Sequence, residues 1–180
     1  DHWFFETEVR DQILEHRENR MFLTDFRLSS NLTPYLELEP VIAGKDLLLL
    51  VVPSHVMRQT ALHMAALVPA HAIVVSASKG IENQTHLTMT GVLAETLPHL
   101  PPGSLAALSG PSFAREVAAG VPTVVTLACR DREVAAGPEY AAGAWFRFLF
   151  GSGYRELWTT PIEAPVLDLE AEADTVLTLY

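Results

Sequence analysis

This 180-residue chain has few lysines, one cysteine and no excess of positive charge. Only Lys45 and Lys79 stand beside ten arginines, and the formal net charge is −10. This balance argues against a nucleic-acid backbone or an anionic membrane surface as the main partner, because both require clustered basic residues. An anionic ligand must therefore be met by local groups, and Lys79 is a candidate for that role.

Several other features are missing. The single cysteine, Cys129, cannot form an internal disulfide, and its apolar surroundings predict a core side chain in a protein of the reducing cytosol. No apolar run reaches the length of a membrane span. The histidines show no metal-ligand spacing with carboxylates or cysteine, so we predict no metal site. No G-x-G-x-x-G fingerprint of a dinucleotide-binding turn occurs.

Strand-like and helix-like segments alternate along most of the chain. The segments predicted as strands are 3–5, 47–52, 72–76, 104–108 and 121–129. The segments predicted as helices are 8–20, 56–67, 85–97, 133–150 and one that ends at Gly120. Residues that favour turns fill most of the stretch from 19 to 34. This alternation predicts an α/β fold with a doubly wound, mostly parallel sheet.

A polar turn follows each of two predicted strands. Ser76-Ala77-Ser78-Lys79-Gly80 ends the strand at 72–76, and Ser109-Gly110-Pro111-Ser112-Phe113-Ala114 follows the strand at 104–108. Open α/β sheets bind ligands at the carboxyl ends of their parallel strands, so the two turns together predict a ligand site. There Lys79 would neutralise a phosphate or stabilise the negative charge on a carbonyl oxygen during reduction. The alternative is a solvated loop lysine.

The second turn has its own chemistry. Pro111 at a first helical position would leave the following backbone N–H groups unpaired at the positive end of the helix, and Gly110 would let a ligand approach the backbone. An anion or a carboxamide fits such a site. The alternative is a plain strand-to-helix turn in which Ser112 is the cap.

A hydroxyl and an imidazole stand together in Val52-Pro53-Ser54-His55. No acid is placed to complete a catalytic triad, so a helix-start role for Ser54 is favoured.

Taken in order, these motifs resemble the N-terminal Rossmann domain of the NAD(P)-dependent glycerol-3-phosphate dehydrogenases. The likeness covers about the first 160 residues with consistent spacing. The matching segments are Trp3-Phe4-Phe5-Glu6, Arg17-Glu18-Asn19-Arg20-Met21-Phe22-Leu23, Leu28-Ser29-Ser30-Asn31-Leu32, Val51-Val52-Pro53-Ser54-His55, Ser78-Lys79-Gly80-Ile81-Glu82, Ser109-Gly110-Pro111-Ser112-Phe113-Ala114, Glu116-Val117-Ala118 and Gly120-Val121-Pro122-Thr123. The resemblance implies reversible hydride transfer between a nicotinamide dinucleotide and dihydroxyacetone phosphate, giving sn-glycerol 3-phosphate.

The resemblance also implies roles for individual residues. Lys79 would touch both the nicotinamide end of the cofactor and the substrate, and would be the catalytic residue. Gly110 and Ser112 would hold the substrate. Pro53 and Ala114 would contact the cofactor, Ala114 through its backbone.

Phe5 falls where the family meets the adenosine end of the cofactor. Some family members carry Arg or His there, which suits a 2′-phosphate, whereas Phe5 offers a flat apolar surface. We therefore expect NAD to be preferred over NADP.

Both ends of the chain depart from the family pattern. Family members open with a strand, a glycine-rich turn and a helix that bind the pyrophosphate, so we expect a Rossmann-like sheet that lacks this first βα unit. The likeness ends near residue 160, which predicts a partial NAD-binding domain over 1–160 and a divergent acidic tail over 161–180. The tail lacks the lysine that serves the family as general acid.

These departures lead us to expect an incomplete enzyme. The chain alone should be marginally stable, with an aggregation-prone edge at 47–52 and little or no activity. Two alternatives stay open. One is a different Rossmann reductase, such as a ketopantoate or hydroxyacid reductase. The other is a non-enzymatic remnant that pairs its sheet edge with another chain, including a second copy of itself.

Overall fold

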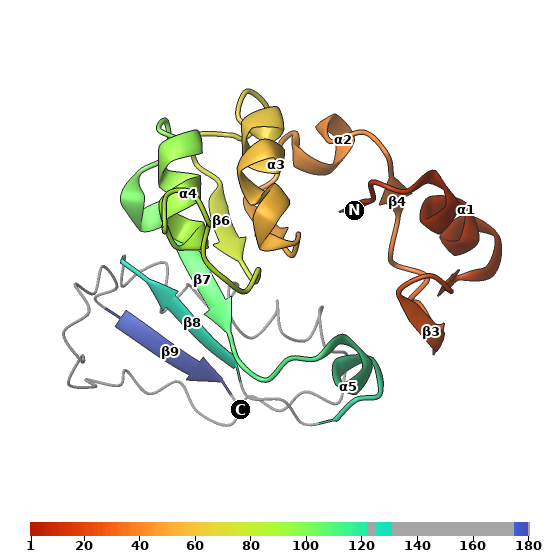
Figure 1. Cartoon of the computed structure of the whole chain (residues 1–180). Helices are drawn as coiled ribbons and strands as arrows, with labels where there is room; N and C mark the ends of the chain where they lie inside the picture. The colour runs from red at the N-terminus through yellow and green to blue at the C-terminus, as the bar shows by residue number, and fades with distance from the viewer. Residues whose placement is uncertain (122–124, 131–174, 180) are drawn as a thin grey trace.

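Three parallel strands begin the main sheet in the computed structural model, which describes residues 1–121, 125–130 and 175–179 (Figure 1). They are β5 (Leu47–Leu50), β6 (Ile73–Ser76) and β7 (Leu105–Ser109), adjacent in that order. The sheet continues with β8 (Val125–Cys129) and β9 (Thr175–Leu179), each antiparallel to the strand before it. The predicted α/β class with a parallel-rich sheet is therefore confirmed. Of the two added strands, β8 runs opposite to the parallel strands and β9 runs in the same direction as them.

The register of the parallel strands brings their carboxyl ends to one edge. Leu50 pairs with Ser76, and Ser76 pairs with Ala107. The strand predicted over 47–52 ends at Leu50, the last residue paired with β6, and Val51 beyond it is 63% exposed. β5 has β6 as its one neighbour in the described sheet, so it forms an edge, as predicted for this segment.

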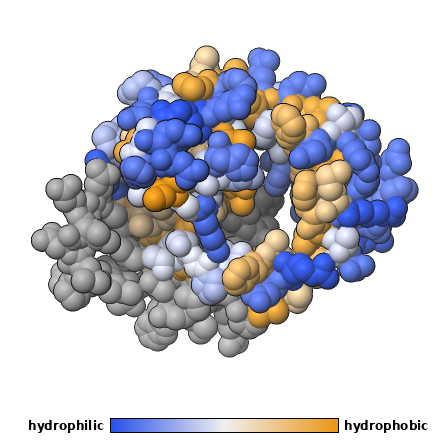
Figure 2. Space-filling model, viewed as in Figure 1, coloured by the Kyte–Doolittle hydropathy of each residue, from blue (hydrophilic) through white to orange (hydrophobic). Residues whose placement is uncertain are grey.

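Helices α3 (Met57–Met64) and α4 (Met89–Thr96) pack together against one face of the sheet (Figure 1). Their apolar residues meet alternate side chains of the strands, since successive residues of a strand point to opposite faces. The buried cluster on this face includes Leu48, Leu50, Val74, Met57, Met64, Leu93 and Leu97. Hydrophilic side chains cover much of the outer surface of this layer (Figure 2).

A second apolar cluster lies on the opposite face of the sheet. It contains Val75, Ala106, Val125, Leu127 and Cys129. Cys129 is 1% exposed, and its thiol donates to the carbonyl of Gly103 at 3.1 Å. The predicted core role of Cys129 is confirmed.

The N-terminal segment forms two small sheets around one helix. β1 (His2–Trp3) pairs in parallel with β4 (Pro34–Tyr35), and β2 (Glu18–Asn19) pairs antiparallel with β3 (Leu23–Arg27). Helix α1 (Thr7–His16) packs beside them through its buried residues Val9 and Ile13. A hollow separates much of this segment from the rest of the molecule (Figure 2).

Two predictions for this segment are wrong at the residue level. The helix predicted over 8–20 ends at His16, because Arg17 takes a left-handed conformation with φ 59°. The guanidinium of Arg17 donates a hydrogen bond to the carbonyl of Leu32 at 2.7 Å. The stretch predicted as turns contains the β2–β3 hairpin. Its strands are short and polar, so they lack the apolar alternation by which a strand is recognised.

The other helices are shorter than predicted. The 3₁₀ turn η1 (Ser54–Val56) precedes α3, and α4 starts only at Met89, where the Oγ1 of Thr88 accepts from the N–H of Gly91 at 3.2 Å. The remaining short helices are α2 (Glu39–Ile42), η2 (Pro102–Ser104) and α5 (Ala114–Ala118).

The helix predicted over 133–150 and the division at residue 160 lie outside the described residues. No helix in the described part of the chain is long and apolar enough to cross a membrane.

Candidate functional site

The turn that carries Lys79 is anchored to the end of β5. The N–H of Ala77 donates to the carbonyl of Leu50 at 2.8 Å, and the hydroxyl of Ser78 donates to the carbonyl of Val52. These bonds extend the parallel pairing beyond the last paired residues of β5 and β6. The backbone just before Lys79 is therefore held at the carboxyl edge of the sheet, where α/β folds bind ligands.

The backbone on the other side of Lys79 turns at Gly80. Its φ of +118° lies in a region that L side chains rarely adopt, and a Cβ at this position would lie 3.1 Å from the Oγ of Ser54. Ser54 is the first residue of η1, but the N-cap residue is Pro53, so Ser54 starts this turn without capping it. The side chain of Ser54 instead lies next to Gly80.

A Gly80→Ala substitution is expected to lower the free energy of unfolding by about 1–3 kcal/mol, because it adds backbone strain and a close contact with Ser54. Gly44→Ala is the matched control, since Gly44 also has a positive φ of 68° but has no atom within 4 Å of an added Cβ. Urea denaturation of both variants tests whether Gly80, which combines a φ of +118° with the contact to Ser54, costs more stability to replace than Gly44 does. Equal losses in the two variants would contradict a specific role for the Gly80–Ser54 contact.

Lys79 joins the two polar turns. Its Nζ donates to the carbonyl of Gly110 at 2.9 Å and lies 5.2 Å from the centre of the Phe113 ring. The contact spans 31 residues of sequence, and it brings together the two turns that were predicted to form one site. Gly110 has a φ of 151°, so a residue with a side chain is disfavoured where Lys79 approaches the backbone.

The two lysines differ in whether a carboxylate pairs with the ammonium. Lys45 forms an ion pair with Asp1, whereas no carboxylate in the described part of the chain pairs with Lys79. The Gly110 carbonyl and the Phe113 ring orient the ammonium without neutralising it. Lys79 therefore presents an available positive charge on an acidic protein.

The predicted helix start at Pro111 is wrong. α5 begins at Ala114 with Phe113 as its N-cap residue, and Phe113 makes no side-chain capping bond. The positive φ of Gly110 turns the chain, and residues 111–113 then remain outside the helix. Ser112 is thus neither cap nor helical residue, whereas Ala114 is the first residue of the five-residue helix.

A pocket of about 360 Å³ opens between the carboxyl ends of β6 and β7 and the start of α4. Its lining includes Ser76, Ser78, Lys79, Thr88 and Ser109. The hydroxyl of Ser76 is buried and has no hydrogen-bond partner among the described atoms. The polar groups around Lys79 therefore line this cavity, and their chemistry would suit a polar ligand.

Phe5 and Pro53 stand differently in the fold. Pro53 immediately precedes Ser54 and so lies close to the Gly80 turn. Phe5 is 81% exposed, and its ring meets that of Trp3 edge-on at 6.4 Å. No described contact joins Phe5 to the Lys79 turn.

Two residues of the site were given no role of their own from the sequence. Phe113 places its ring beside the ammonium, and Ser78 bonds to the end of β5. Both lie inside the quoted motifs, next to residues that were singled out. Their contacts bridge segments distant in sequence, so local pattern carried no signal for them.

Comparison with known proteins places this geometry in a family context. A family model described as NAD-dependent glycerol-3-phosphate dehydrogenase N-terminus matches residues 1–135. A glycerol-3-phosphate dehydrogenase [NAD(P)+] of Syntrophobacter fumaroxidans is 41% identical over 160 residues, which are 89% of this chain and 45% of the relative. One from Geobacter metallireducens is 43% identical over 134 residues, which are 74% of this chain and 40% of the relative. The chain spans less than half the length of these curated relatives.

Solved structures agree in fold. The crystal structure of glycerol-3-phosphate dehydrogenase from Coxiella burnetii matches with a TM-score of 0.66 at 30% identity, over 73% of this chain and 39% of that one. The glycerol-3-phosphate dehydrogenase of Plasmodium falciparum matches with a TM-score of 0.67 at 24% identity, over 81% of this chain and 38% of that one. The second likeness concerns the fold alone.

Proposed function

Because this chain belongs to the NAD-dependent glycerol-3-phosphate dehydrogenase family, we propose that it supplies the nicotinamide-binding part of an enzyme that interconverts dihydroxyacetone phosphate and sn-glycerol 3-phosphate. The cofactor would be NAD or NADP. Dihydroxyacetone-phosphate-dependent oxidation of NADH, compared between the chain and its Lys79→Ala variant, tests this proposal.

The contact between Lys79 and Gly110 is the observation that supports the proposal most directly. It places an ammonium that pairs with no carboxylate of the described residues at the carboxyl edge of the parallel strands. A phosphorylated ketone and a dinucleotide are both anionic, and this chain carries a net charge of −10. A local cation is therefore needed to bind them.

The residues present fit such ligands. The flat ring of Phe113 lies beside the ammonium, and Gly110 leaves the backbone open to close approach. When bound, the nicotinamide ring supplies or accepts the hydride. Lys79 would exchange the Gly110 carbonyl for the carbonyl oxygen of the substrate and stabilise the charge that develops there. Gly110 and Ser112 would hold the substrate, while Pro53 and Ala114 would border the cofactor.

Proton delivery to the carbonyl oxygen of the substrate is the step that we expect to be slow in this chain. Reduction of a ketone places an electron pair on the carbonyl oxygen, which must then take up a proton. Lys45 is the one other lysine in the sequence, and it pairs with Asp1. We therefore propose that the chain alone turns over slowly, since a positioned acid contributes a factor of about 10² to 10⁴ in rate.

Cofactor choice is proposed to depend on Phe5. The chain should bind NADH more tightly than NADPH, because Phe5 offers no positive charge to a 2′-phosphate. A Phe5→Arg variant is expected to shift the ratio of dissociation constants towards NADPH by about tenfold, the effect of one charge-assisted contact. Phe22→Arg is the matched control, since it adds the same charge at another exposed phenylalanine.

Equilibrium titration followed by dinucleotide fluorescence measures both constants without requiring turnover. A wild-type preference for NADPH, or an equal shift in the two arginine variants, would contradict this role for Phe5.

We also propose the domain division and the cellular location. Residues 1–160 would form a partial NAD-binding domain and 161–180 a divergent tail, in a cytoplasmic protein. A second candidate function is favoured by the position of β5 at the edge of the described sheet, from which it would pair with another chain, including a second copy, in a binding or regulatory module.

A further inference from the structure

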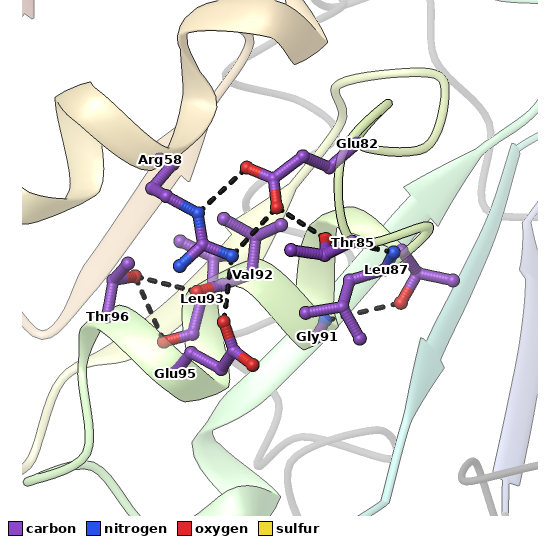
Figure 3. A network of polar contacts seen from close by, with 10 residues as sticks. Arg58, Glu82, Thr85, Leu87, Gly91, Val92, Leu93, Glu95 and Thr96 are labelled. Atoms are coloured by element: carbon purple, nitrogen blue, oxygen red, sulfur yellow. Dashed lines mark hydrogen bonds and ion pairs between the residues drawn. The ribbon is translucent and has the colours of Figure 1, made fainter.

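Arg58 on α3 connects three separate elements (Figure 3). Its Nε and Nη2 donate to the two carboxylate oxygens of Glu82, each at 2.8 Å, and Nη2 also donates to the carboxylate of Glu95 at 2.8 Å. Glu95 belongs to α4, whereas Glu82 belongs to the loop that follows Lys79 and Gly80. One guanidinium thus ties the loop to both helices of the layer.

The loop from 81 to 88 is closed around Glu82. The N–H of Glu82 donates to the carbonyl of Leu87, and the N–H of His86 donates to the carbonyl of Glu82, both at 2.9 Å. The hydroxyl of Thr85 donates to the carboxylate oxygen of Glu82 that also accepts from Nη2 of Arg58 (Figure 3). Ile81 and Thr88 form an isolated bridge across the base. Holding Glu82 therefore holds the whole loop.

The Arg58–Glu82 pair is stronger than an ordinary surface ion pair. Its geometry is bidentate, and the Glu82 side chain is only 11% exposed. Hydrogen bonds from Arg58 and Thr85 lower the pKa of Glu82 to about 2, so its carboxylate is ionised at neutral pH. Fork-like pairing of a guanidinium with a carboxylate adds geometric specificity to the attraction, which suits a positioning role.

Lys79 lies between two anchors in the sequence. Before it, Ser78 is bonded to the end of β5, and after it, Glu82 is bonded to α3. Only Gly80 and Ile81 separate Lys79 from the second anchor, and Gly80 by itself imposes little conformational restriction. Release of Glu82 would thus free the backbone on one side of Lys79.

We propose that Arg58 is a positioning residue which, through Glu82, holds the loop that places the Lys79 ammonium beside Gly110. This inference rests on the proposed function for the catalytic meaning of Lys79. It implies that a change at the Arg58–Glu82 contact alters the surroundings of the Lys79 ammonium, at the other end of the 79–82 turn.

The scarcity of lysine makes this coupling measurable. Reductive methylation with ¹³C-formaldehyde labels the N-terminal amine and just two side chains, Lys45 and Lys79, and a dimethylated Lys79 keeps one N–H for the Gly110 carbonyl. In Glu82→Gln the Lys79 methyl signal is expected to move more than halfway towards its position in the urea-unfolded chain. The Lys45 signal is expected to stay in place.

Glu95→Gln is the matched control. It removes a carboxylate from the same arginine but leaves the bidentate contact with the loop, so the Lys79 signal is expected to stay at the wild-type position. Arg58→Lys keeps the charge but loses the fork, and an intermediate displacement is expected. If circular dichroism shows that Glu82→Gln is unfolded, the Thr85→Val variant decides between the outcomes. It removes the hydroxyl bonded to Glu82, and a smaller displacement in the same direction is expected.

An unmoved Lys79 signal in folded Glu82→Gln, or in Thr85→Val where that variant decides, would overturn the inference. Equal displacement in Glu82→Gln and Glu95→Gln would also overturn it, because general loosening of the α3–α4 layer would then explain both. Failure of the proposed function has a different signature. The NMR response would persist while Lys79→Ala left dihydroxyacetone phosphate reduction unchanged.

Discussion

Replacement of Lys79 by alanine is expected to lower kcat/KM for reduction of dihydroxyacetone phosphate with NADH by about 10²- to 10³-fold, the usual effect of removing one donor to a developing oxyanion. Lys79 is oriented by the Gly110 carbonyl and the Phe113 ring, and no described carboxylate neutralises it. The loss should appear in kcat as well as in KM, because the interaction strengthens as charge develops on the substrate oxygen. Following NADH absorbance with the chain in excess allows slow single turnovers to be measured.

Lys45→Ala is the control for this experiment. It removes the other lysine of the chain, whose ammonium pairs with Asp1, and is expected to leave the rate unchanged. Equal rates in Lys79→Ala and the wild type would contradict the role assigned to Lys79. If folded wild-type chain shows no substrate-dependent oxidation and forms a concentration-dependent oligomer on gel filtration, pairing through the edge of β5 becomes the better account of its function.

Replacement of Leu93 by alanine is expected to lower the free energy of unfolding by about 2–5 kcal/mol, the cost of a cavity at a fully buried leucine. Leu93 is 0% exposed and lies in the cluster that joins α3, α4 and the sheet. Urea denaturation followed by circular dichroism measures the change. Such a loss is a large part of the total stability of a small domain.

Leu62→Ala is the matched control for the core substitution. Leu62 lies on α3 but is 57% exposed, so its truncation should cost much less than that of Leu93. Similar losses at the two leucines would contradict the packing of α4 against the sheet described above.

The local sequence predicted the central strands and the turns after them closely. β6 and β7 lie within one residue of the predicted bounds at either end, since each is a short apolar run that a polar turn ends. Lys79 and Gly110 were also predicted to belong to one site. That prediction needed only the rule that parallel strands bring their carboxyl ends to the same edge.

The start of α5 and the β2–β3 hairpin were predicted wrongly. In the first case, a proline after a glycine is as compatible with an extended turn as with a helix start, and the placement of Gly110 under Lys79 selects the turn. In the second, the hairpin is packed near α5. There Arg115 donates to Thr24 and lies 5.5 Å from the ring of Phe26. Contacts of this kind cross many residues and leave no periodic pattern in the chain.

The sequence by itself determined the α/β class, the family and the two turns that carry the chemistry. Each of these depends on short runs of residues whose backbone preference or apolar character is local. The tertiary structure decided which partners those turns take: Lys79 with Gly110 and Phe113, Gly80 with Ser54, and Glu82 with Arg58. Such pairings depend on the packing of α3 and α4 on the sheet, because only the folded chain brings side chains so distant in sequence within a few ångströms of one another.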